Sequence, residues 1–289
     1  MDQHIIETLG KTKVFVEDGK VVKVEHAEKR LEYCPVVEKV FGIQNLMDDS
    51  ARLGVERRIE RWGMCTPARK IKETTESFVS FGASEILSNA LNDGLIDAAV
   101  TVCDGAGTVI TDQGDVMQGI GVAMSGLTLT SPIVEVIRNL EGEGAIILDP
   151  ERASIDQVAG LERAFKDHDC VGVTLTSPDV AKMCRDVEKA NPGKKAVLFG
   201  VHTTGLSRDD AKALIDTVDL TTGCASRHLR SQIGEMALLQ VGRSVPIFAI
   251  TQTGKELILN RMKHITTQLF VETRTLPELK DEDQPSPLF

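Results

Sequence analysis

The chain has 289 residues, 42% of them hydrophobic, which is enough to build the core of one large α/β domain or two smaller ones. Its 33 Lys and Arg against 43 Asp and Glu give a net charge of -10, which excludes the electrostatic footprint of a nucleic-acid-binding or anionic-membrane-binding protein. The N-terminus lacks the pattern of a signal peptide, and the uncharged residues 116–134 are too polar to span a bilayer, so we expect a cytoplasmic protein.

The first predicted elements form a small N-terminal unit over residues 1–75. Apolar and polar side chains alternate along residues 12–26 on either side of Asp18 and Gly19, which predicts a β-hairpin with a tight turn. Amphipathic spacing predicts helices at residues 36–41 and 49–62. We expect this hairpin and helix unit to pack as an appendage on the main domain.

Residues 76–270 predict an α/β domain, because short apolar runs alternate with amphipathic segments as they do in βαβ units. Strands are expected at residues 96–103, 145–148, 171–175, 196–201, 220–222 and 245–250, and helices at 84–95, 112–126, 132–140, 155–166, 180–189, 208–218, 225–239 and 256–264. Roughly six such units are too few for an eight-unit barrel, so we predict an open, mostly parallel, doubly wound sheet. Residues 271–289 are charged and contain proline, which predicts a mobile acidic tail.

The segment IDAAVTVCDGAGTVI, residues 96–110, places a thiol and a carboxylate at the end of a buried strand. Ligands of open α/β sheets bind at the carboxyl ends of the strands, so Cys103 and Asp104 are site candidates, with Asp104 as an acid–base group. A buried cysteine before a tight turn at Gly105 is the alternative interpretation.

Four of the six cysteines lie in loops next to or near glycine or proline: Cys34, Cys65, Cys103 and Cys224. Four thiolates suit an iron–sulfur cluster, of the 4Fe–4S type first, or a structural zinc ion, although the chain has no CxxC pair. One reactive thiol, or four inert thiols, are the alternatives. Cys170 and Cys184 are predicted to be packing residues.

Catalytic and anion-binding candidates follow other predicted strands. Cys224 begins a predicted helix, where the helix dipole together with Arg227 and Arg230 favours a nucleophilic thiolate. His202 follows a buried strand and is a candidate general base, against the alternative of a loop-bonded histidine. Two loop endings offer backbone N–H groups and hydroxyls as anion cradles, with ordinary polar turns as the alternative. They comprise Thr203, Thr204 and Gly205 in one loop and Thr253, Gly254 and Lys255 in the other.

Several motifs occur in a characteristic order: YCP at residue 33, GMCTP at 63, FVSFGASEIL at 78, IDAAVTVCDGAGTVIT at 96, LDP at 148, IDQ at 155, VHTTG at 201, TTGCAS at 221 and TGKELI at 253. Between residues 4 and 260 the chain thereby resembles methanogenesis marker protein 8, an archaeal family. The resemblance implies a cytoplasmic protein of methane-metabolising archaea that serves methyl-coenzyme M reductase or its cofactors, with methanogenesis enzymes or assembly proteins as partners. It implies no reaction and no catalytic residue.

Three functional hypotheses follow. The first is an accessory protein of methanogenesis that carries a Cys-ligated cluster or metal ion. The second is a thiol-dependent enzyme or transferase acting on a small anionic cofactor, with Cys224 or Cys103 as nucleophile, His202 as base and Lys255 holding the anion. The third is a non-catalytic assembly factor that binds a partner through the N-terminal unit and the tail. No nucleic-acid or membrane partner is expected, and homo-oligomers are left open.

Overall fold

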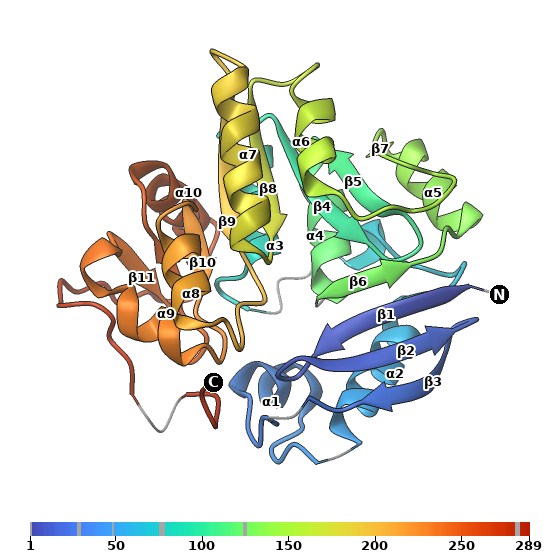
Figure 1. Cartoon of the computed structure of the whole chain (residues 1–289), viewed down its shortest axis with the longest axis horizontal. Coiled ribbons are helices and arrows are strands. Elements are labelled where there is room, and N and C mark those ends of the chain that lie inside the picture. The colour runs from blue at the N-terminus through green and yellow to red at the C-terminus, as the bar shows by residue number, and fades with distance from the viewer. Residues whose placement is uncertain (1, 28–29, 48, 75–78, 124–125, 281–283) are drawn as a thin grey trace.

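The computed structural model describes residues 2–27, 30–47, 49–74, 79–123, 126–280 and 284–289 (Figure 1). The strands are β1 (Gln3–Thr8), β2 (Thr12–Glu17), β3 (Lys20–Glu25), β4 (Ala98–Cys103), β5 (Gly107–Thr111), β6 (Leu127–Thr130), β7 (Ile146–Ile147), β8 (Cys170–Leu175), β9 (Lys195–Gly200), β10 (Leu220–Thr222), β11 (Leu239–Val241) and β12 (Ile247–Ala249). The helices are α1 (Pro35–Phe41), α2 (Ser50–Trp62), α3 (Ala83–Asn92), α4 (Gly114–Ala123), α5 (Val134–Gly142), α6 (Gln157–Ala164), α7 (Pro178–Ala190), α8 (Arg208–Ile215), α9 (Arg227–Gln232) and α10 (Gln252–Lys263).

A four-stranded antiparallel sheet, in the order β3-β2-β1-β6, forms the N-terminal part of the molecule (Figure 1). The predicted hairpin is confirmed: β2 and β3 pair across Asp18 and Gly19, both at positive φ. Strand β1 and strand β6 were not predicted, and β6 comes from far along the chain. The division of the chain into 1–75, 76–270 and 271–289 stays a prediction. Three predicted features lie outside the described residues: the boundary at residues 75 and 76, the end of the predicted helix 112–126 at residues 124–125, and tail residues 281–283.

The second sheet is mixed, with its strands in the order β11-β12-β10-β9-β8-β4-β5-β7. The four central strands β4, β8, β9 and β10 are parallel, as expected. Strands β5 and β12 run antiparallel to their neighbours, because short turns at residues 104–106 and 242–246 return the chain directly, whereas parallel pairing needs a long crossover. The expected α/β class is therefore observed, while the doubly wound, mostly parallel arrangement is not confirmed.

Helices cover both faces of this sheet. One apolar cluster joins α6, α7, α8 and α9 to one face, and a second joins α3, α4 and α10 to the other. Side chains of a strand buried on both faces alternate between the clusters, as Ala99 and Val100 of β4 do. Cys184 is fully buried in the first cluster, which confirms its predicted packing role. None of the helices in the described part of the chain has the length and apolar character needed to span a bilayer.

The end of the chain packs against the rest of the protein in residues 284–289. Gln284 is buried, and Ser286 forms an antiparallel bridge with Tyr33 ahead of α1. The backbone N–H of Phe289 donates to the Ala225 carbonyl at 2.9 Å. These six residues therefore connect α1 with the segment between β10 and α9.

Candidate functional site

The carboxyl ends of the four parallel strands meet at one edge of the mixed sheet, the edge at which open α/β sheets bind ligands. Cys103 ends β4, while His202 and Cys224 follow β9 and β10. His202 and Cys224 are held at φ 55° and 34°, a backbone conformation that costs a non-glycine residue roughly 1–3 kcal/mol and is concentrated at functional sites. This edge therefore carries the candidate site.

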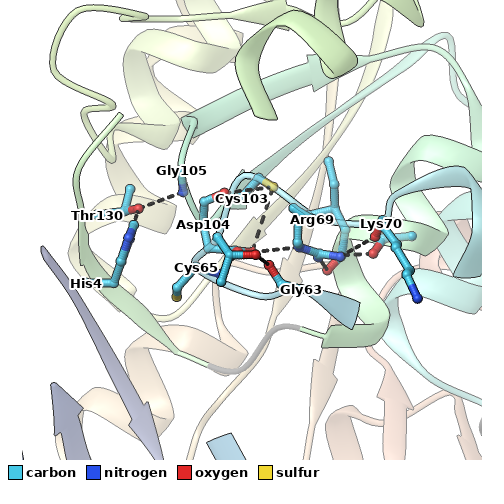
Figure 2. A network of polar contacts seen from close by, with 12 residues as sticks. His4, Gly63, Cys65, Arg69, Lys70, Cys103, Asp104, Gly105 and Thr130 are labelled. Atoms are coloured by element: carbon cyan, nitrogen blue, oxygen red, sulfur yellow. Dashed lines mark hydrogen bonds and ion pairs between the residues drawn. The ribbon is translucent and has the colours of Figure 1, made fainter. Parts of the chain in front are cut away.

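Cys103 and Asp104 are closed off from solvent by the loop that follows α2 (Figure 2). In that loop the backbone N–H of Cys65 donates to Asp104 Oδ2 at 2.5 Å. Arg69 donates from Nε to Asp104 Oδ1 at 3.0 Å, and both side chains of this ion pair are 0% exposed. Asp104 is thus engaged in a buried ion pair. The predicted acid–base role would require a carboxylate that a substrate can reach, and Asp104 is enclosed.

Cys65 and Cys103, the inner thiol pair, flank this ion pair on Asp104 and interact with each other electrostatically. Burial raises the pKa of both thiols, and the Asp104 carboxylate raises it further. Burial lowers the pKa of Arg69, but attraction to the Asp104 carboxylate, with contributions from Cys103 and Cys65 where they ionise, outweighs burial and raises the pKa of that guanidinium. The inner thiol pair therefore consists of neutral thiols beside a compensated charge pair.

Cys34 and Cys224, the outer thiol pair, are half-buried and close enough to interact electrostatically. Cys34 is the N-cap of α1, and burial raises the pKa of its thiol against the effect of the Val37 and Val36 N–H groups. Cys224 lies two residues before Ser226, the N-cap of the six-residue helix α9, so the predicted longer helix starting at Cys224 is wrong. The Cys224 sulfur lies 3.2 Å from Thr222 Oγ1.

Arg230 of α9 is 3% exposed and lies beside the outer thiol pair, and its place near Cys224 agrees with the expectation from the sequence. Its guanidinium donates to the carbonyl oxygens of Cys224 and Ser244 and to the side-chain oxygen of Gln284. All three acceptors are neutral, and no carboxylate in the described residues, which leave out 281–283, pairs with Arg230. Burial lowers the pKa of Arg230 to about 10, and attraction to thiolates at Cys224 and Cys34 opposes that shift.

Arg227, the second cation expected at this thiol, points elsewhere. Its guanidinium donates to the carbonyl oxygen of Leu288 at 3.1 Å, at an exposed position. Its backbone N–H donates to the Phe289 carbonyl at 2.6 Å. Of the two arginines, Arg230 is therefore the one positioned to act on the outer thiol pair.

His202 is bonded across to the N-terminal sheet. Its Nε2 lies 3.0 Å from Glu7 Oε1, and Lys11 Nζ lies 2.8 Å from the same oxygen. Burial opposes ionisation of Glu7, but hydrogen bonds from His202 and Lys11 outweigh it and lower the pKa of Glu7 to about 2. An ionised carboxylate from β1 therefore holds the imidazole that follows β9.

The two predicted anion cradles lie at opposite edges of the mixed sheet. Thr203 Oγ1 donates to the Thr222 carbonyl at 2.7 Å and Thr204 Oγ1 accepts from Ala225 N–H at 3.3 Å, so the loop with Gly205 is at the thiol edge. The other loop follows β12, and because β12 is antiparallel to β10 it emerges beside Asp219, at the start of β10. There Gly254 N–H caps α10 by donating to Thr251, and Thr253 accepts from Lys195. The structure therefore does not bring Thr253, Gly254 and Lys255 together with Cys224 and His202.

The four loop thiols do not converge. Cys65 lies with Cys103 and Cys34 lies with Cys224, and no group of three or more Cys, His, Asp or Glu side chains in the described residues is arranged to hold a metal ion. The segments carrying Cys34 and Cys65 pack against different neighbours, residues 284–289 in one case and Asp104 in the other. The residues present therefore do not fit the expected four-thiolate site for a 4Fe–4S cluster or zinc within one chain.

Three residues of this edge were missed by the sequence reasoning: Glu7, Arg69 and Gln284. Arg69 lies two residues after the GMCTP motif, and an arginine in a loop ordered by glycine and proline was the available signal. Glu7 and Gln284 reach the site through pairing with distant segments, which no local pattern announces.

Comparisons with known proteins agree on an archaeal family. A family model described as "Uncharacterized protein conserved in archaea (DUF2099)" matches residues 4–263. "Uncharacterized protein MJ0054" of Methanocaldococcus jannaschii is 39% identical over 289 residues, which covers 100% of both chains. Among solved structures, the F420-reducing NiFe hydrogenase complex from Methanosarcina barkeri matches with 14% identity, 67% of this chain, 75% of that chain and a TM-score of 0.38. A TM-score this low carries no inference about fold or function.

Proposed function

This chain belongs to the archaeal protein family DUF2099, and on that premise we propose that it is a thiol-dependent accessory protein of methane metabolism, with Cys224 as its reactive thiol. The motif resemblance to methanogenesis marker protein 8 supports the biological setting. The chemistry is supported by one observation above the others, which is the buried Arg230 beside two free thiols.

A buried charge without a counter-charge is costly, by several kcal/mol per ion even after the surroundings relax. The neutral oxygens around Arg230 offset part of this cost by hydrogen bonding, but they do not cancel the charge. Within the described part of the chain, the ionisable groups that act on Arg230 are the two thiols of the outer pair. The guanidinium of Arg230 therefore stabilises a negative charge at Cys224, whether that charge is on the thiolate or on a bound anionic ligand.

Cys224 combines partial accessibility, which it shares with Cys34, with a positive φ, which it shares with Cys65, and it is the one thiol of the four that has both. Cys65 and Cys103 are 1% and 0% exposed, whereas Cys224 is only half-buried. Its positive φ is an unfavourable conformation that the surrounding bonds to Arg230 and Ala225 maintain. We infer that the ligand is small and anionic, since Arg230 has no carboxylate partner among the described residues, which leave out 281–283, and a guanidinium binds anions.

The 4Fe–4S cluster is not part of this proposal, because its four predicted ligands lie in two separate pairs. A cytoplasmic setting follows from the resemblance and remains part of the proposal. The biological side is tested by growth of a methanogen from which the gene for this protein is deleted. The deletion strain is complemented with the wild-type gene or with the C224S variant. The proposal expects wild type to restore methane-dependent growth and C224S to fail at equal protein abundance.

The chemical side is tested by alkylating the intact protein with iodoacetamide at pH 7 and following each cysteine by mass spectrometry. Cys170 is an internal control, because it is also free and half-buried while burial raises the pKa of its thiol. Cys224 is expected to react roughly tenfold faster than Cys170, the ratio that about 1.4 kcal/mol of thiolate stabilisation produces. Equal rates at the two cysteines, or faster reaction of Cys170, would contradict the proposal.

A further inference from the structure

The loop that carries His202 is fastened to the loop that carries Cys224. Thr203 donates to the Thr222 carbonyl, and Thr204 accepts from Ala225 N–H, so each bond joins residues within two positions of His202 and Cys224. Both loops continue parallel strands, β9 and β10, which pair directly. His202 and Cys224 therefore belong to one rigid edge rather than to two independent loops.

The His202 side chain is held from the other sheet. Glu7 at the end of β1 bonds Nε2 at 3.0 Å, and its backbone N–H donates to the Gly126 carbonyl at 2.7 Å. A Cβ atom at Gly126 would lie 2.7 Å from His202 Cδ2 and 2.8 Å from Nε2, so only glycine leaves room for the imidazole in this position. The ring is therefore held between a carboxylate and a backbone segment of the N-terminal part.

We propose that Glu7 is a positioning residue that fixes His202 as the Nε2–H tautomer, so that Nδ1 is left to accept a proton at the strand-end edge that carries Cys224. This inference rests on the proposed function for the identity of the thiol. A carboxylate only accepts hydrogen bonds, so the nitrogen it contacts must carry the proton and the other ring nitrogen is left free to take one.

The ionised state of Glu7 is secured independently of His202. Lys11 contacts the same carboxylate oxygen at 2.8 Å, and both Glu7 and Lys11 come from the β1–β2 hairpin. The charged groups that the structure places at the imidazole are Glu7, which contacts Nε2, and Lys11, which contacts the same carboxylate oxygen. Cys224 and Arg230 belong to the adjoining loop and helix, which hydrogen bonds from Thr203 and Thr204 fasten to the His202 loop. The imidazole of His202, which follows the mixed sheet, is therefore oriented by the β1–β2 hairpin of the N-terminal sheet.

The proton position is tested by ¹⁵N NMR of the imidazole rings in the full-length protein, with the His202 signals assigned by their loss in H202Q. Wild type is expected to show the Nε2–H tautomer of the neutral ring, and E7Q a mixture of both tautomers. The K11M variant is the matched control, since it removes the lysine and keeps the Glu7 contact, and it is expected to retain Nε2–H. An Nδ1–H ring in wild type, or an unchanged ring in E7Q, would overturn the inference.

The chemical role is tested by the alkylation rate of Cys224 at pH 7 in the same variants. H202Q is expected to slow Cys224 roughly tenfold and to leave Cys170 unchanged, because only the outer thiol loses its proton acceptor. E7Q is expected to slow it less, and E7D to restore the rate. An H202Q protein that alkylates like wild type would overturn the role of His202.

The two tests separate the inference from the proposed function. If Cys224 is not the fastest thiol in wild type, the proposed function fails, while the tautomer measurement still decides whether Glu7 positions His202. If Cys224 is fast but wild type shows Nδ1–H, the proposed function stands and the inference fails. The exposed pair of His264 and Asp93, 2.7 Å apart, gives a reference signal that E7Q must leave unchanged.

Discussion

Two cysteine pairs lie at the edges of the same fold, each beside a buried arginine, and they differ in what balances the arginine. The inner thiol pair adjoins Arg69, which Asp104 neutralises at 3.0 Å with no exposed side-chain surface on either partner. The outer thiol pair adjoins Arg230, whose described hydrogen-bond acceptors are neutral oxygens. The difference teaches that a buried arginine next to a thiol is structural where a carboxylate balances it, and is available to an anionic thiolate or ligand where none does.

The largest expected effect comes from breaking the balance at the inner thiol pair. D104N leaves Arg69 buried without a counter-charge, and we expect the free energy of unfolding to fall by about 3–5 kcal/mol. Urea denaturation followed by circular dichroism measures it. D169N is the control, because Asp169 forms an exposed ion pair with Lys194 at 2.7 Å, and its loss is expected to cost less than about 1 kcal/mol. Equal stability of D104N and D169N would refute the structural role of the inner ion pair.

Replacing each arginine by methionine sharpens the comparison. R69M leaves the Asp104 carboxylate buried without its partner and is expected to cost about 3–5 kcal/mol. R230M removes a charge that no described carboxylate balances, residues 281–283 being left out, and is expected to cost about 1–2 kcal/mol from lost hydrogen bonds. Both values come from the same denaturation experiment. If R230M destabilises the protein as much as R69M does, Arg230 has a counter-charge and the distinction between the pairs disappears.

A smaller effect is expected in acid, at the contact between Glu7 and His202. The pKa of Glu7 is about 2 in the folded protein against an ordinary value of 4.5, so the ionised carboxylate stabilises the fold above pH 4.5 and this contribution is lost as the pH falls towards 2. After allowance for partial exposure, we expect wild type to exceed E7Q by roughly 1–2 kcal/mol at pH 6. The difference is expected to vanish near pH 2, and a difference that grows on acidification would have the wrong sign.

The sequence predicted those parts of the fold that depend on local patterns. The hairpin around Asp18 and Gly19 and the parallel succession β4, β8, β9 and β10 follow from alternation and from βα spacing. The antiparallel direction of β12 and the pairing of β6 with β1 depend on partners distant in the sequence. Because the direction of β12 decides where its loop emerges, the position of Lys255 was not predictable from its motif.

The candidate site was predictable to the same extent. Position at strand ends directed attention to Cys224 and His202, and the expectation that Arg230 lies near Cys224 is met by the hydrogen bond from its guanidinium to the Cys224 carbonyl. The sequence did not reveal that Asp104 is enclosed, because enclosure depends on the loop through Arg69. Likewise, the grouping of four cysteines into two pairs depends on which segments pack over each strand end, and a residue type carries no such information.

The central claim is that Arg230 stabilises negative charge at Cys224, and the ratio of the alkylation rates of Cys224 and Cys170 in wild type and R230M tests it most directly. Both thiols are measured in one sample, so differences in protein concentration and reagent cancel. We expect the ratio to fall roughly tenfold in R230M and to be largely retained in R230K, which keeps the charge. A ratio that is the same in wild type and in a folded R230M protein would contradict it.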